Sequence, residues 1–136
     1  MALITGTSGN DFAHPNDGAA PPAGYNDLPQ ATNGGDIFTS GGGGNDIARL
    51  GLGNDRFTFG SDLNGADKLD GGSGDDELRI EDAVNATFAS DSLASIERIL
   101  LANTGAAGQR RLVLNDANIA TGDSLEIDAG SLSAAR

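Results

Sequence analysis

The stretch Gly71-Gly72-Ser73-Gly74-Asp75-Asp76-Glu77-Leu78-Arg79 follows the nine-residue pattern G-G-x-G-x-D-x-U-x, in which U is a large apolar residue. Residues 41–49 and 50–58 follow the same pattern without a gap between them, so that their aspartates, Asp46 and Asp55, are nine residues apart. A short unit that recurs at a fixed period predicts a stack of equivalent structural units rather than a conventional globular core.

Three further segments carry the pattern in a weaker form. Residues 62–70 keep Gly65 at the fourth position but lack the first two glycines, and residues 31–39 and 6–14 are weaker copies nearer the N-terminus. The six copies share an aspartate at the sixth position: Asp11, Asp36, Asp46, Asp55, Asp67 and Asp76.

Glycine and aspartate in this arrangement are typical of a calcium site. Calcium takes six to eight oxygen ligands from carboxylates and backbone carbonyls. Glycine adopts positive φ at no steric cost, so a glycine-rich turn can direct several carbonyls to one point. The residues after each aspartate are too few for a helix and suit a short strand with its apolar residue pointing inward. A flexible linker has a similar composition, but it has no reason to place Phe57 and Leu78 two residues after an aspartate.

These copies resemble the nonapeptide repeats of the RTX family of calcium-binding proteins. The resemblance implies an all-β fold, a right-handed parallel β-roll (a β-solenoid), in which each ion lies between the stacked turns of alternate copies. It pairs Asp46 with Asp67, Asp55 with Asp76, Asp36 with Asp55, and Asp11 with Asp46. It also implies carbonyl ligands from glycines of the turns: Gly42, Gly44, Gly51, Gly53, Gly65, Gly72 and Gly74. About three to four calcium ions follow from the number of ligands that calcium requires.

The chain changes character near residue 80. Residues 1–80 hold 17 of the 21 glycines and form the predicted roll, with residues 15–31, which contain all four prolines, as a loop inserted between the first two copies. Apolar clusters within residues 81–136 predict short strands that continue the solenoid without calcium and cap its open end. Within this part, Ser92–Ile96 fits a helical turn. A small separate β domain is the alternative for residues 81–136.

The composition excludes several classes of partner. A net charge of −12 argues against nucleic acids and anionic membrane surfaces, both of which attract basic patches. There is no cysteine, hence no disulfide or thiolate site. No apolar stretch is long enough for membrane insertion or for a cleavable signal peptide. The resemblance instead implies secretion to the cell exterior by a type I route, without a cleaved signal peptide.

Catalysis is not expected. His14 is the only histidine and has no partner at a catalytic spacing, and no phosphate-binding loop is present. We therefore expect a calcium-binding module, not an enzyme, that stays unfolded inside the cell and folds on binding calcium after secretion. Two alternatives remain open: an adhesin or surface-matrix protein that binds a polysaccharide or another cell-surface partner, and a non-catalytic accessory module of a larger secreted enzyme.

Overall fold

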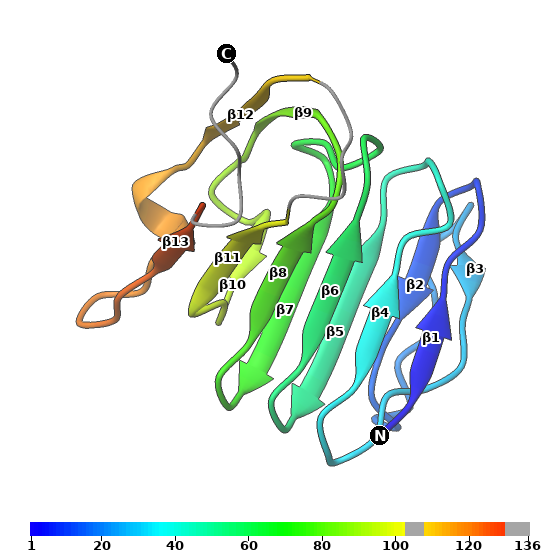
Figure 1. Ribbon diagram of the computed structural model, residues 1–136. Coiled ribbons are helices and arrows are strands. Elements are labelled where there is room, and N and C mark those ends of the chain that lie inside the picture. Colours follow the sequence, from blue (N-terminus) through cyan, green and yellow to red (C-terminus); the bar gives the residue numbers. More distant parts are fainter. Residues whose placement is uncertain (103–107, 130–136) are drawn as a thin grey trace.

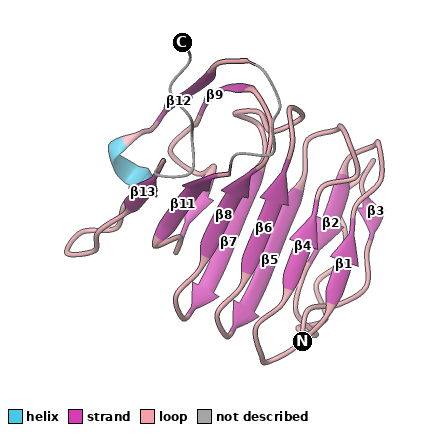
Figure 2. Ribbon diagram, viewed as in Figure 1, coloured by secondary structure: helices cyan, strands magenta, loops and turns pink. Residues whose placement is uncertain are grey.

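The computed structural model describes residues 1–102 and 108–129, and over these residues the chain is all-β with parallel strand pairing. Two sheets face each other, and the chain passes from one sheet to the other through the turns at their ends (Figures 1 and 2). The N-terminal strands lie at one end of this stack and the C-terminal strands lie at the other (Figure 1). The all-β prediction is therefore confirmed.

The six-stranded sheet contains, in spatial order, β1 (Leu3–Thr5), β4 (Ile37–Thr39), β6 (Arg56–Phe59), β8 (Glu77–Ile80), β11 (Arg98–Leu101) and β13 (Glu126–Asp128). The five-stranded sheet contains, in spatial order, β10 (Leu93–Ala94), β7 (Lys68–Ser73), β5 (Ile47–Leu52), β2 (Asp11–Ala13) and β3 (Asn26–Asp27). A separate pair joins β9 (Val84–Thr87) to β12 (Arg110–Val113). A single 3₁₀ turn, Asp116–Asn118, lies between β12 and β13 and is capped by Asn115.

The repeat pattern explains how consecutive copies alternate between the sheets. From β4 to β8 the strands fall in turn into the six-stranded and five-stranded sheets, so alternate copies become neighbours. In the six-stranded sheet Phe57 lies opposite Phe38 and Leu78 opposite Phe57, and in the five-stranded sheet Leu69 lies opposite Ala48. The apolar residue of each copy thus stacks on its equivalents.

The core lies between the sheets and is built from these apolar positions. The predicted inward residues are all buried, at 1% exposure or less: Ala13, Phe38, Ala48, Phe57, Leu69 and Leu78. Large side chains of one sheet, such as Phe57, share this core with the small Ala13 and Ala48 of the other. The inward orientation inferred from the sequence pattern is confirmed.

Residues 15–31 are not only a surface loop. They contain β3, which pairs with β2 at the edge of the five-stranded sheet, and an isolated parallel bridge between Pro15 and Ala31. His14 is buried, and its ring nitrogens lie 3.1 Å from Asp17 Oδ1 and 3.2 Å from Asp27 Oδ1. The inserted segment therefore covers an otherwise open sheet edge, where unpaired backbone groups would invite association.

The C-terminal strands extend both sheets. β11 pairs with β8 and β13 with β11, while β10 pairs with β7. The helical turn considered for Ser92–Ile96 is wrong, because Leu93 and Ala94 form a strand. These two residues pair with Leu69 and Asp70 of β7, and a local helical turn would not make this pairing.

Candidate metal centre

The turns before the strands bring the six repeat aspartates into two columns. The first aspartate column, beside the five-stranded sheet, consists of Asp11, Asp46 and Asp67; the second, beside the six-stranded sheet, consists of Asp36, Asp55 and Asp76. Each column precedes a set of paired strands in register, so that its members lie side by side. All four aspartate pairs that the resemblance implies are therefore neighbours in space.

Each column is linked by the same hydrogen bond, in which one backbone N–H donates to the carboxylate of the next aspartate. In the first column Asp11 N lies 3.1 Å from Asp46 Oδ1, and Asp46 N lies 2.8 Å from Asp67 Oδ1. In the second column Asp36 N lies 2.6 Å from Asp55 Oδ1, and Asp55 N lies 2.7 Å from Asp76 Oδ1. One oxygen of each accepting carboxylate is thus engaged by the backbone.

The aspartates are buried, with side chains stacked in the turns, and this environment opposes their negative charge. All six are at most 2% exposed. Burial, followed by the charges of Asp67 and Asp11, raises the pKa of Asp46 to about 7. Burial likewise raises the pKa of Asp67 and of Asp76 to about 6, and raises the pKa of Asp55. Buried carboxylates of this kind are neutralised by protons unless another cation is present.

Two carboxylate oxygens of the second column have no hydrogen-bond partner among the described residues. They are Asp55 Oδ2 and Asp76 Oδ2, and both are inaccessible to solvent. A buried polar atom without a partner costs roughly 1–3 kcal/mol, and more when it is charged. A cation bound at these oxygens would remove that cost, so the residues present fit a metal ion.

The first member of each column differs, because a threonine four residues upstream satisfies its carboxylate. Thr7 donates through its backbone N–H and its hydroxyl to Asp11, with the hydroxyl at 2.8 Å. Thr32 makes the same two bonds to Asp36, at 2.6 and 2.7 Å. Although burial acts in the opposite direction, the bonds from Thr32 and from the backbone hold the pKa of Asp36 below its usual value. The protein itself thus supplies the hydrogen bonds of both first carboxylates.

Six of the seven glycines predicted as ligands have the positive φ that a ligand-binding turn requires: Gly42, Gly44, Gly51, Gly53, Gly72 and Gly74. The turns also stack backbone on backbone, since a Cβ added to Gly74 would lie 1.9 Å from Gly53 O, and one added to Gly72 would lie 2.1 Å from Gly51 O. Only glycine allows carbonyl groups of adjacent turns to approach so closely.

Gly65 is the exception among the seven. Its φ is not in the positive region, and its carbonyl accepts a hydrogen bond of 2.8 Å from Ser92 Oγ. A Cβ at this position would lie 1.9 Å from Thr87 O. Glycine is therefore required here by close packing against the neighbouring turn, and its carbonyl is already engaged.

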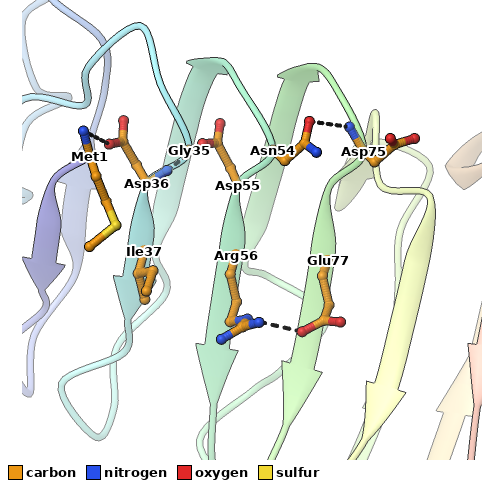
Figure 3. Close-up of a pocket in the computed structure, with 9 residues that line it drawn as sticks. All are labelled: Met1, Gly35, Asp36, Ile37, Asn54, Asp55, Arg56, Asp75 and Glu77. Carbon is orange, nitrogen blue, oxygen red and sulfur yellow. Dashed lines mark hydrogen bonds and ion pairs between the residues drawn. The ribbon is translucent and has the colours of Figure 1, made fainter.

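A groove of about 280 Å³ runs beside the second column (Figure 3). Asp36 and Asp55 lie side by side in it, and Asn54 accepts a hydrogen bond of 3.1 Å from Asp75 N at the rim. Farther along, Arg56 Nε lies 3.0 Å from Glu77 Oε1. The groove brings solvent close to Asp36 and Asp55, two members of the second column.

Carboxylates alone do not complete a metal site. Within residues 1–102 and 108–129, no three His, Cys, Asp or Glu side chains converge to hold an ion. Most of the oxygens around an ion would have to come from backbone carbonyls and water, which are ordinary ligands of calcium. This donor set is poor for zinc, which prefers nitrogen and sulfur.

One acidic residue of the second column was missed by the sequence analysis. Glu97 lies opposite Asp76 in the register, and its Oε2 accepts a hydrogen bond of 2.7 Å from Asp76 N. Its offset of 21 residues from Asp76 equals the offset of Asp76 from Asp55. That spacing, together with Ile99 two residues later, is the signal that could have identified it.

Comparison of the chain with protein-family models, with curated proteins and with solved structures gave no match. The geometry of the two columns is therefore the observation from which a function can be inferred.

In the described part of the chain, no helix has the length and apolar character needed to cross a membrane.

Proposed function

We propose that this chain is a calcium-binding module of the RTX kind, and that its two parallel sheets are the faces of a right-handed parallel β-roll. The observation that carries the proposal is the pair of buried oxygens, Asp55 Oδ2 and Asp76 Oδ2, that have no partner within the described residues and that lie beside glycine turns of positive φ. Calcium is typically bound by oxygen ligands, which are carboxylates with formal negative charge and backbone carbonyls.

Three to four ions would be held between neighbouring turns, with one aspartate from each turn and carbonyls of the intervening glycines. The second column supplies the pairs Asp36–Asp55 and Asp55–Asp76, and the first supplies Asp11–Asp46 and Asp46–Asp67. A bound ion would supply positive charge to carboxylates that the fold has removed from water. The protein contributes the spacing of the oxygens and the exclusion of solvent.

The same chemistry makes calcium a condition for folding. Without an ion, the carboxylates of a column must be desolvated beside one another, which opposes the compact state. At about 1 mM calcium and a dissociation constant near 10⁻⁴ M, each site adds about 1.4 kcal/mol. Four such sites add about 5–6 kcal/mol, which is comparable to the whole stability of a small domain.

In calcium-poor cytosol the free energy that calcium adds to folding falls to near zero. The proposal therefore also says where the chain folds. The chain stays unfolded inside the cell, leaves by a type I route and folds when it meets millimolar calcium outside. The resemblance of the repeats to the RTX family supports this part of the proposal. No catalytic activity is included in it.

The proposal is tested by calcium titration with isothermal calorimetry, with far-UV circular dichroism in parallel and magnesium as the control ion. Uptake of several calcium ions with a gain of β signal is expected, whereas magnesium, which prefers rigid octahedral sites, should have little effect. The double variant Asp55→Asn/Asp76→Asn should lose the ions of the second column and keep those of the first. The matched control is Asp75→Asn, an exposed neighbour at a position where other copies carry asparagine. Equal β content in EDTA and in calcium would overturn the proposed folding switch.

A further inference from the structure

The second aspartate column does not end with the last repeat. β11 pairs with β8 so that Arg98 lies opposite Glu77, which places Glu97 opposite Asp76. The backbone N–H of Asp76 donates to Glu97 Oε2 at 2.7 Å, in the same way that Asp55 N donates to Asp76 Oδ1 at 2.7 Å. Glu97 thus occupies the position of a further aspartate, although its own segment has no nonapeptide pattern.

An oxygen cradle lies between these two members of the column. Asp76 is 1% exposed, and its Oδ2 has no hydrogen-bond partner in the described part of the chain. A Cβ built on Gly71 would lie 2.3 Å from this oxygen and also 2.3 Å from the carbonyl oxygen of Ser95. The two oxygens are therefore no more than twice that distance apart, a separation short enough for one ion to bridge at the calcium–oxygen distance of about 2.3–2.6 Å.

The backbone at Ser95 is shaped to turn its carbonyl toward this cradle. Ser95 has φ +50, and no other non-glycine residue among those described has a positive φ. It follows Gly74 by the same offset of 21 residues that relates Glu97 to Asp76. Its φ lies in the left-handed region, whereas Gly74 has φ +140, so the two turns differ in backbone conformation. A non-glycine residue in the left-handed region is strained, and such strain gathers at functional sites where the surrounding structure enforces it.

Charge in this region favours a cation. Besides burial, the negative charges of Asp55, Glu97 and Asp70 act on Asp76. The nearest arginine on β11, Arg98, is directed to other carboxylates, with Nη1 3.2 Å from Glu77 Oε2 and Nη2 paired with Asp128. Ser95, Glu97 and Asp123 also line a cavity of about 10 Å³, which is about the volume that one water molecule needs.

We propose that Asp76, Ser95 and Glu97 form an additional calcium site that joins the last repeat to the C-terminal strands. Asp76 Oδ2, Ser95 O and the Glu97 carboxylate supply protein oxygens, and water completes the shell. The site rests on the proposed calcium-binding function but requires one ion more than the repeats alone provide. Its consequence is that β11, and β13 beyond it, dock on the repeats in a calcium-dependent way.

The number of calcium ions bound by each variant tests the additional site. Native mass spectrometry and calorimetry in calcium should give one ion fewer for Glu97→Gln than for the unaltered chain, because glutamine keeps an oxygen to accept the Asp76 N–H bond but lacks the charge. Glu126→Gln, which removes an exposed carboxylate from β13, is the matched control and should leave the count unchanged. If the unaltered chain binds no calcium, the proposed function fails. If it binds several ions and Glu97→Gln binds as many, only the additional site fails.

A second measurement decides the matter if Glu97→Gln does not fold. Crystals of the unaltered chain grown with calcium, or with terbium as an anomalous scatterer, should show an ion within coordination distance of Asp76 Oδ2 and Ser95 O. Ions at the repeat pairs without one at this position would overturn the additional site and leave the proposed function standing.

Discussion

Acidification should stabilise the calcium-free chain and weaken its binding of calcium. The carboxyl groups of Asp46, Asp67 and Asp76 have pKa values raised by burial to about 7, 6 and 6. A carboxyl group whose pKa is higher in the folded state than in the unfolded state binds protons more tightly when folded. Its stabilising contribution is complete at low pH and is lost as the pH rises through the folded pKa.

The size of the effect follows from these values and the ordinary aspartate pKa of 3.8. Between pH 8 and pH 5, the proton linkage stabilises the folded state by about 2–3 kcal/mol for Asp46 and by about 1 kcal/mol each for Asp67 and Asp76. Because the charge of Asp67 itself helps to raise the pKa of Asp46, the combined effect is less than the sum, a few kcal/mol, which is comparable to the contribution expected from calcium at several sites. If the proposed function holds, a proton and a calcium ion are thus alternative ways to neutralise the same columns.

The assay is far-UV circular dichroism in EDTA at pH 8, 6.5 and 5, in which the folded fraction gives the free energy of unfolding even where that free energy is negative. The free energy of unfolding should rise as the pH falls, whereas the calcium concentration at half-saturation should increase over the same range. Asp76→Asn mimics a protonated side chain, so it should be more stable than the unaltered chain in EDTA at pH 8 and less sensitive to pH. Histidine in general changes charge in this range, and the series is therefore repeated in His14→Gln. A calcium-free chain that loses stability on going to pH 5 would refute the reasoning.

Three substitutions, two of them paired with a control substitution, test the packing and the hydrogen bonding, each by urea unfolding in saturating calcium. Gly74→Ala should abolish folding, because its Cβ would lie 1.9 Å from a carbonyl oxygen of the stacked turn; Gly122→Ala, also at positive φ but with no atom within 4 Å, should cost only about 1 kcal/mol. Phe57→Ala should cost about 3–5 kcal/mol in the core, whereas Leu52→Ala, at 51% exposure, should change stability by about 0.5 kcal/mol or less. Thr32→Val removes a hydroxyl bond to a buried carboxylate and should cost about 1–3 kcal/mol.

The repeat could be predicted from sequence because each copy has the same parts, a turn with an aspartate followed by a strand with one buried apolar residue. A fixed period places equivalent residues of alternate copies at one level, so Phe57 on Phe38 and Asp55 on Asp36 follow once the chain is assumed to alternate between two sheets. Burial of Phe57 and Leu78 then follows from the two-residue period of a strand.

The segments without a repeat could not be predicted in the same way. The strand at Asn26–Asp27 has no apolar alternation, and it forms because the edge of β2 offers unpaired backbone groups. Leu93 and Ala94 form a strand for the same reason against β7. In both cases the partner, which is distant in sequence, decides the conformation over local propensity.

At the ends of the columns, the residues that complete the site are not part of the repeat pattern's aspartate positions. Each link runs from a backbone N–H to the carboxylate of the next level, so an unfinished column has a carboxylate without a donor at one end and an N–H without an acceptor at the other. In the second column, Thr32 and the N–H of Ala2 supply donors to Asp36, while Glu97 supplies an acceptor to Asp76. The residues that finish a column must satisfy its hydrogen bonds but need not belong to the repeat. Thr32 therefore supplies the donor, and Glu97 the acceptor, that a further aspartate of the column would supply.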